Sequence, residues 1–158
     1  MRVMIVDDNV DAVEMLTLFL KGIGYEVSFA YDAKSALDLA RAEPPRVMLL
    51  DIGLPDHDGY ELAKRVRSLP QTADAVLIAL TGYGQPEDQQ RSASAGFDHH
   101  FTKPADATKL ATLLAEIRSA FLPMNGLSQL VDGGRCAPNA QFNRNGQRRE
   151  HQVGMTGR

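Results

Sequence analysis

Several residues suited to phosphate chemistry stand at or soon after the ends of short apolar runs. They are Asp7, Asp8, Asp51, Thr81 and Lys103. Three carboxylates gathered in one place would raise one another's pKa by repulsion unless a cation lay among them. A carboxylate beside a metal ion, a hydroxyl and an ammonium group offers what phosphoryl transfer requires, an acceptor oxygen and positive charge around the phosphate oxygens. Asp51 is the expected acceptor.

The cation expected among these carboxylates is Mg²⁺. The candidate ligands are oxygens, without His or Cys, and such a set favours a hard divalent ion. Mg²⁺ usually takes one or two carboxylates and leaves positions for water and phosphate oxygens. The sequence therefore predicts Mg²⁺ as the cofactor.

Strand-like apolar runs alternate with helical patterns through residues 1–122, which predicts five strands and five helices. Three runs are continuously apolar, as in parallel strands covered on both faces. They are 3–6, 47–50 and 76–80. The runs 25–29 and 97–101 are mixed, which favours edge positions. Because the carboxyl ends of parallel strands meet at one edge of an open sheet, we expect the candidate site residues to lie together there.

The clearest helical pattern is an apolar stripe near the end of this region. It comprises Leu110, Leu113, Leu114, Ile117 and Phe121. A first helix is expected from near Asn9 to Gly22, and a second between Asp32, as its N-cap, and Pro44. Two more are expected at 60–69 and 85–94, the last with hardly any apolar face.

The chain has 158 residues, of which 44% are hydrophobic and 23% charged, and this is typical of one globular domain with a short appendage. Residues 1–122 hold 12 basic and 18 acidic residues, a balance of −6, whereas 123–158 hold 5 and 2, a balance of +3. Only five of the last 36 residues are Leu, Ile, Val or Phe. We therefore expect a domain at 1–122 and a mostly disordered Gly, Asn, Gln and Arg-rich tail at 123–158.

The expected location is the cytoplasm. Cys136, the single cysteine, has no second thiol for a disulfide or a metal site. The longest apolar runs are far shorter than the roughly 20 residues that cross a bilayer. Near the start of the chain, acidic residues stand where the apolar stretch of a signal peptide would have to continue. We expect neither a membrane span nor an exported chain.

Four motifs, taken together, resemble the receiver domain of bacterial two-component response regulators. They are Asp7-Asp8, the segment from Asp51 to Gly59, Thr81-Gly82 and Lys103-Pro104. The resemblance covers residues 1–122 and implies a flavodoxin-like α/β fold, a doubly wound (βα)5 parallel sheet with strand order 2-1-3-4-5. This order agrees with the edge and central strands inferred from the apolar runs.

The resemblance also implies a role for each site residue. Asp51 would accept a phosphoryl group from a phosphohistidine of a sensor histidine kinase or histidine phosphotransfer protein. Asp8, Asp51 and the backbone carbonyl of Gly53 would bind Mg²⁺ directly, and Asp7 through a metal-bound water. Lys103, before a proline whose peptide bond is usually cis in this family, would pair with Asp51 and then with a phosphate oxygen.

Thr81 is implied to donate its hydroxyl to the phosphoryl group and so to switch a surface formed by the fourth helix, fifth strand and fifth helix. Receivers often carry a Tyr or Phe three positions before the lysine, with a ring that swings inward, but this chain has His100. Two interpretations of His100 follow: its imidazole rotates inward and responds to pH, or it is simply a partly exposed histidine of an edge strand. The second interpretation is favoured.

Three other functions have weaker support in the sequence. An aspartyl-phosphate phosphatase-like enzyme would typically carry a second Asp two residues after the nucleophile, where this chain has Gly53. A receiver segment of a hybrid histidine kinase remains an alternative, because 96–104 resembles such receivers. A DNA-binding role ranks last, since the basic tail has no recognition motif and we expect no nucleic-acid partner. We expect a signalling module, whose only catalysis is its own phosphorylation and dephosphorylation at Asp51.

Overall fold

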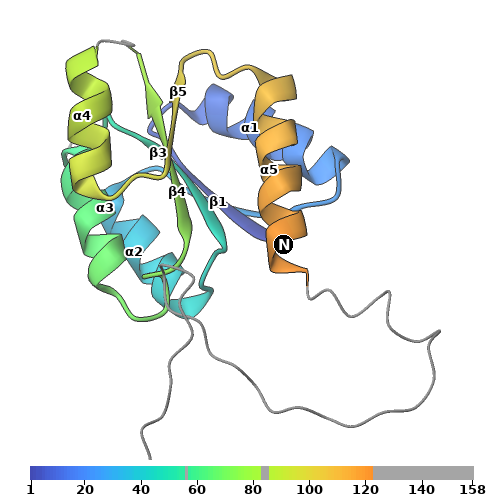
Figure 1. Cartoon of the computed structure of the whole chain (residues 1–158), viewed down its shortest axis with the longest axis horizontal. Coiled ribbons are helices and arrows are strands. Elements are labelled where there is room, and N and C mark those ends of the chain that lie inside the picture. The colour runs from blue at the N-terminus through green and yellow to red at the C-terminus, as the bar shows by residue number, and fades with distance from the viewer. Residues whose placement is uncertain (56, 83–85, 123–158) are drawn as a thin grey trace, which may run out of the picture. The chain divides into compact units, whose positions relative to one another are not determined.

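The structure is a computed structural model, and it describes residues 1–55, 57–82 and 86–122, with the backbone alone for 86–89. Strands and helices alternate along the described chain (Figure 1). The strands are β1 (Arg2–Val6), β2 (Glu26–Ala30), β3 (Val47–Asp51), β4 (Val76–Thr81) and β5 (His99–Thr102). The helices are α1 (Val10–Gly22), α2 (Ala33–Ala42), α3 (Gly59–Ser68), α4 (Pro86–Ala95) and α5 (Ala107–Phe121).

The five strands form one parallel sheet in the order β2-β1-β3-β4-β5. The predicted flavodoxin-like fold and strand order are therefore confirmed, and the two mixed runs do form the edges. The register pairs Val6 with Leu50 and Asp51 with Leu80, so β1, β3 and β4 end at the same edge of the sheet. This alignment brings the residues that follow these strands to one place.

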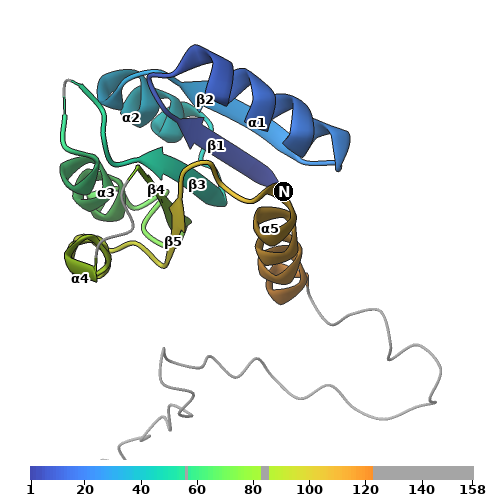
Figure 2. The same cartoon turned by 90° about the horizontal axis from the view of Figure 1, so that it is seen from above.

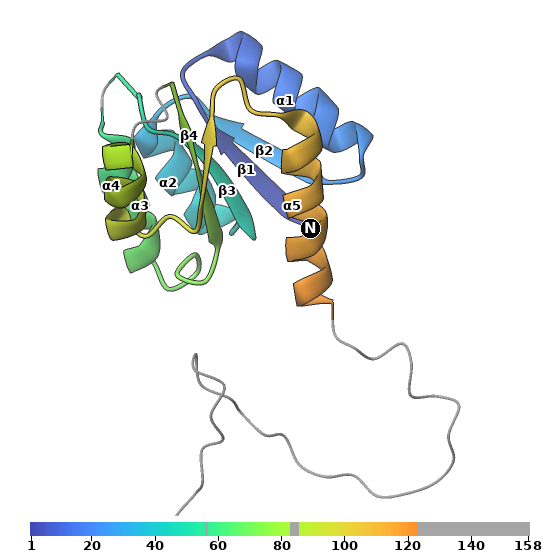
Figure 3. The same cartoon turned by 45° about the horizontal axis from the view of Figure 1, so that its top comes forward.

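Two apolar cores cover the two faces of the sheet. Figures 2 and 3 show α1 and α5 on one face and α2, α3 and α4 on the other. Leu20 of α1 and Leu114 of α5 pack with Ile5 and Leu49, while Leu37 of α2 and Leu62 of α3 pack on the opposite face. The central strands are buried on both sides, which explains why their sequences are continuously apolar.

Polar caps fix where four of the helices begin. Asn9 accepts a hydrogen bond from the backbone N–H of Ala12 at 3.2 Å, and Asp32, as predicted, accepts from Ser35 at 2.8 Å. Asp58 and Asp106 cap α3 and α5 in the same way. Each cap satisfies backbone donors that the first turn of a helix leaves without a partner.

The fifth strand differs from the prediction, which placed it at 97–101. The chain turns at Gly96, with a φ of 97°, and Phe97 enters the core before the strand begins at His99. The side chain of Asp98 accepts a hydrogen bond from the backbone N–H of Leu77 at 2.8 Å. The regular pairing of β5 with β4 begins only at the next residue, where His99 pairs with Ile78.

The expectation of a disordered tail at 123–158 lies outside the described residues, and the domain boundary after residue 122 stays a prediction. Within 1–55, 57–82 and 86–122, every helix is too short or too polar to span a bilayer.

Candidate functional site

The three predicted carboxylates meet at the carboxyl edge of the sheet. Asp7 and Asp8 follow β1, and Asp51 is the last residue of β3. One oxygen from each of the three lies within 4.8 Å of the others. Asp7 and Asp51 are only 1% and 6% exposed, whereas Asp8 is exposed. Two buried carboxylates this close require positive charge beside them.

Lys103 supplies part of that charge. Its Nζ lies 2.7 Å from Oδ2 of Asp7 and 3.0 Å from Oδ2 of Asp51. Burial acts to lower the pKa of Lys103, but the hydrogen bonds that its ammonium donates to Asp7 and Asp51, with the attraction of their negative charges, outweigh burial and raise the pKa above its usual value. The Lys103–Pro104 peptide bond is cis, and the backbone N–H of Lys103 donates to the carbonyl of Thr81 at 2.7 Å.

Backbone N–H groups hold the other oxygen of each buried carboxylate. Oδ1 of Asp7 accepts from the N–H of Asn9 at 2.9 Å, and Oδ1 of Asp51 accepts from the N–H of Gly53 at 3.0 Å. Each carboxylate is thus fixed at one oxygen and directed toward Lys103 at the other. Such fixed donors hold the carboxylates in one orientation before any ligand binds.

A hollow of about 360 Å³ opens beside Asp51. It is lined by Asp51, Ile52, Gly53, Tyr60, Thr81, Gly82 and Lys103. The predicted acceptor, hydroxyl and ammonium therefore face one space, which is polar where the strands end. The wall formed by Tyr60 is braced by an edge-on contact with Phe97, with ring centroids 6.3 Å apart, and by the guanidinium of Arg91 over the ring.

The oxygen-only donor set fits the Mg²⁺ that the sequence predicts. Asp7, Asp8 and Asp51 offer three carboxylates within reach of a single ion, two of them already oriented by backbone N–H groups. The roles of Asp8 and of the Gly53 carbonyl as direct ligands, and of Asp7 as an indirect one, stay predictions.

His100 contacts the predicted switch residue. Its Nε2 lies 2.9 Å from Oγ1 of Thr81, and its Nδ1 lies 3.3 Å from Oγ of Ser92 on α4. The ring is half-buried, so the expectation of partial exposure is met. Sequence reasoning missed these two contacts, because a lone histidine in a strand carries no signal of what its ring will touch.

Gly59, the first residue of α3, lies against the backbone that follows β3. It is buried, and its N–H donates to the carbonyl of Ile52 at 3.2 Å. A Cβ at this position would lie 2.6 Å from the Asp51 carbonyl oxygen and from Ile52 Cα. Gly59 thus lets α3 approach the backbone of the acceptor. The signal was a glycine where a better helix former would otherwise be expected.

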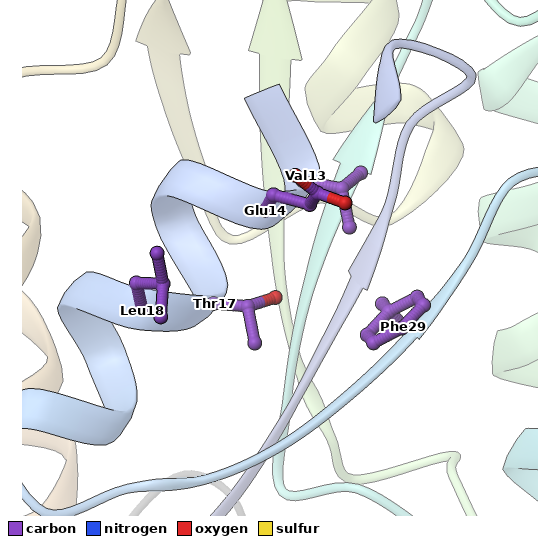
Figure 4. Close-up of a pocket in the computed structure, with 5 residues that line it drawn as sticks. All are labelled: Val13, Glu14, Thr17, Leu18 and Phe29. Atoms are coloured by element: carbon purple, nitrogen blue, oxygen red, sulfur yellow. The ribbon is translucent and has the colours of Figure 1, made fainter. Parts of the chain in front are cut away.

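A second hollow, of about 290 Å³, lies between α1 and β2 (Figure 4). It is lined by Val13, Glu14, Thr17, Leu18 and Phe29, and none of these is a predicted site residue. The buried hydroxyl of Thr17 has no hydrogen-bond partner in the described part of the chain. This hollow is apart from the carboxylates.

Two relatives each match about three quarters of this chain. A relative from Leptolyngbya boryana, an uncharacterized 14.6 kDa protein from the sodA1 3' region, is 38% identical over 123 residues, 78% of this chain and 94% of that protein. The DNA-binding dual master transcriptional regulator RpaA of Synechocystis is 32% identical over 118 residues, 75% of this chain but only 48% of RpaA. The chain thus spans about half of that regulator.

Solved structures give the same relationship. A putative response regulator from Chloroflexus aurantiacus is 34% identical, with a TM-score of 0.70 over 75% of this chain and 97% of that one. The family model of the response regulator receiver domain matches residues 3–115, the segment that carries the sheet, the carboxylates and Lys103. The chain belongs to the receiver domains of two-component response regulators.

Proposed function

We propose that this receiver domain accepts a phosphoryl group on Asp51, and that phosphorylation changes the conformation of a surface to which a partner protein binds. The observation that carries the proposal is the arrangement around Asp51. One of its oxygens is held by the Gly53 N–H, the other faces Lys103, and Thr81 lines the same hollow. An oriented acceptor, an ammonium and a hydroxyl in one space are suited to phosphoryl transfer.

The proposed donor is a phosphohistidine of a sensor histidine kinase or a histidine phosphotransfer protein. A carboxylate oxygen of Asp51 forms a bond to phosphorus while the bond from phosphorus to the imidazole nitrogen breaks. The leaving nitrogen takes up a proton, and the product is an acyl phosphate on Asp51. Lys103 is placed to shift from the Asp51 carboxylate to an oxygen of the transferred group, and Thr81 to donate its hydroxyl hydrogen to another.

Mg²⁺, held by Asp8, Asp51 and the Gly53 carbonyl with Asp7 acting through water, would neutralise charge on the phosphate oxygens when bound. The chain's own residues prepare for this. The N–H groups of Asn9 and Gly53 fix Asp7 and Asp51, and Lys103 offsets their repulsion. Burial of both carboxylates strengthens each of these interactions.

The output proposed for phosphorylation is the surface of α4, β5 and α5. Thr81 ends β4, and its carbonyl accepts the N–H of Lys103, so movement of Thr81 is coupled to the segment after β5. Lys103 directly follows β5, a strand of that surface, so a shift of Thr81 or Lys103 toward the phosphoryl group would reach β5 through this backbone bond.

Partner class and location belong to the proposal as well. RpaA is named as a DNA-binding regulator, but this chain spans less than half of it, so our expectation of a protein partner without nucleic acid stays a prediction. The cytoplasmic location expected from the lone cysteine is likewise proposed.

A phosphatase-like enzyme is disfavoured because this chain has Gly53 at the position where such enzymes would carry a second Asp. We propose that the domain catalyses only its own phosphorylation and dephosphorylation. Attachment to a hybrid kinase remains the alternative context.

The proposal is tested by intact-mass spectrometry of the wild type, Asp51→Asn and Asp58→Asn. Each is incubated with acetyl phosphate, and separately with phosphoramidate, whose P–N bond matches that of phosphohistidine, with Mg²⁺ or with EDTA. Asp58 is the matched control, because it lies on the loop after Asp51 and Asn preserves its role as a helix cap.

One phosphoryl adduct that requires Mg²⁺, persists in Asp58→Asn and is lost in Asp51→Asn supports the proposal. An adduct of equal size on Asp51→Asn would move the acceptor elsewhere. A folded wild type that takes no phosphoryl group from either donor would contradict the proposal.

A further inference from the structure

The hollow between α1 and β2 holds a buried hydroxyl group that lacks a hydrogen bond. Figure 4 shows the oxygen of Thr17 turned from α1 toward the ring of Phe29 on β2. Thr17 is 8% exposed, and its hydroxyl has no hydrogen-bond partner within 1–55, 57–82 and 86–122. A buried polar group without a partner costs free energy, so an occupant of the hollow that donates a hydrogen bond to this oxygen would gain from it.

The rim of the same hollow carries negative charge. Glu14 lines the hollow and is exposed, and no basic side chain in the described part of the chain forms an ion pair with it. Asp11, one turn earlier, adds a second exposed carboxylate, whereas Lys21 stands two turns after Glu14. This part of α1 therefore attracts a cation.

Phe29 forms the opposite wall and exposes an aromatic surface. It is 42% exposed on the edge strand, and its ring contacts that of Tyr31 with centroids 5.5 Å apart. Phe121 is equally exposed, but the guanidinium of Arg46 lies 3.5 Å from its ring centroid. Among the described residues, no cation covers Phe29 in this way. A guanidinium can stack on a ring and still donate hydrogen bonds in its own plane, which an ammonium cannot do.

We propose that this hollow binds an arginine side chain of a partner protein. The guanidinium stacks on Phe29, pairs with the Glu14 carboxylate and donates an N–H to the Thr17 hydroxyl oxygen. The methylene groups of the arginine lie against Val13 and Leu18, which complete the lining. The Thr17 oxygen is covered in the free domain, and an outward turn of the half-exposed Phe29 ring opens it.

The inference goes beyond the proposed function and does not rest on it. The hollow belongs to α1 and β2, whereas the proposed output surface consists of α4, β5 and α5. A partner anchored here keeps its contact whether or not Asp51 is phosphorylated, and the output surface stays free to change. Binding is therefore measured on the unphosphorylated protein.

The first experiment is a methyl NMR titration of the full 158-residue chain in EDTA, without a phosphodonor. The probe is N-acetyl-arginine amide, and we expect saturable shifts of the Val13, Thr17 and Leu18 methyl resonances with a Kd in the millimolar range. The citrulline amide lacks the charge and the lysine amide lacks the plane, so both should bind about fivefold more weakly or worse. Equal binding of the three probes, or no saturable shift, would overturn the proposal.

Variants of the lining separate binding from folding. Glu14→Gln and Phe29→Leu should each weaken the Kd by about threefold to tenfold, whereas Glu116→Gln, which removes an exposed glutamate of α5, should leave it unchanged. Thr17→Val keeps the shape and removes the hydroxyl. It should weaken the Kd by about threefold while the melting temperature stays the same or rises, because a buried hydroxyl without a partner is lost.

A lower melting temperature of Thr17→Val with unchanged affinity would show that the hydroxyl serves the fold alone, and would overturn the proposal. Free L-arginine distinguishes a partner's side chain from a metabolite, because its α-ammonium and α-carboxylate are absent from an arginine within a protein. Binding of the blocked amide at least as tight as that of free L-arginine supports the proposal. Tighter binding of the free amino acid would assign the hollow to a metabolite and overturn it.

Discussion

The ammonium of Lys103 lies 3.0 Å from Oδ2 of Asp51, and the same nitrogen lies 2.7 Å from Oδ2 of Asp7. One cation is therefore shared by two buried carboxylates that come from different strands. A divalent ion at the three carboxylates would act on the same negative charge. Lys103 and bound Mg²⁺ should therefore partly replace each other in stabilising the folded domain.

Replacing Lys103 by Met tests this relationship. The variant leaves Asp7 and Asp51 buried without their ammonium, which costs several kcal/mol in a fully buried pair. Because the Lys103 side chain is 31% exposed, solvent reduces the cost, and we expect about 2 kcal/mol in EDTA. Urea unfolding in EDTA and in Mg²⁺ measures it, and Mg²⁺ should recover more stability in Lys103→Met than in the wild type.

The control for this variant is Lys109→Met, which removes an exposed lysine of α5. It should change stability by less than about 0.5 kcal/mol in either buffer. The raised pKa of Lys103 adds a pH test, because its contribution is fully present below the ordinary value of 10.5 and is lost as pH rises through the higher folded value. A gap between wild type and Lys103→Met that closes already between pH 7 and 9 would contradict the contact.

Gly59→Ala should displace the backbone that carries the acceptor Asp51. The added Cβ would meet the Asp51 carbonyl oxygen and Ile52 Cα at 2.6 Å, and both belong to backbone that cannot rotate away. We expect a loss of about 1–3 kcal/mol in the free energy of unfolding, as for overpacked cores, together with slower phosphorylation of Asp51. Urea unfolding and the acetyl phosphate assay measure the two effects.

Gly22→Ala is the matched control, since the added Cβ would meet no atom within 4 Å beyond its chain neighbours and the backbone of its own helix, and the residue ends α1. Alanine favours helix over glycine, so this variant should be neutral or more stable by about 0.5 kcal/mol. If Gly59→Ala behaves like Gly22→Ala, the close approach of α3 to the acceptor strand is not needed.

The sequence was enough to predict the sheet and the gathering of its polar ends. Continuously apolar runs indicated buried parallel strands, and parallel strands bring the residues after them to one edge, so Asp7, Asp51 and Thr81 had to be neighbours. The order of strands came from the resemblance and from the mixed edge runs. These inferences depend on the pattern of polarity alone, which the sequence displays directly.

The contacts between side chains could not be predicted in this way. That one nitrogen of Lys103 reaches two carboxylates depends on a rotamer, and that His100 lies between Thr81 and Ser92 depends on how α4 packs on the sheet. The start of β5 was misplaced because the side chain of Asp98 bonds to Leu77 ahead of the strand. Each of these contacts depends on tertiary packing and leaves no pattern of apolar and polar residues in the sequence.

The cap of α2 gives a prediction for acid conditions. The backbone N–H and hydroxyl of Ser35 hold the pKa of Asp32 below its usual value of 3.8. The cap's contribution is therefore present above that value and is lost as pH falls through the lower folded value. Asp32→Asn keeps an acceptor that does not titrate. The difference in melting temperature between wild type and Asp32→Asn should shift against the wild type below about pH 3.8, and a constant difference would contradict it.

Arg67 of α3 joins three segments on the side of the domain away from the carboxylates. Its guanidinium donates to the carbonyl of Gly96 at 2.7 and 3.0 Å and to the carbonyl of Ala73 at 2.9 Å. It also pairs with the Asp98 carboxylate at 2.6 Å, and that oxygen accepts from the Leu77 N–H as well. A planar fork of donors is needed to reach all of these acceptors at once.

Arg67→Lys keeps the charge but loses the fork, so Lys can satisfy only some of these acceptors. We expect a loss of about 2 kcal/mol in urea unfolding, because part-buried carbonyls are left without donors. Arg65→Lys, on an exposed position of the same helix, should cost less than about 0.5 kcal/mol. Phosphorylation of folded Arg67→Lys should proceed at the wild-type rate, since Arg67 touches none of the site residues. An equal loss of stability in both variants would mean that charge alone, and not the geometry of the guanidinium, ties α3 to the start of β5.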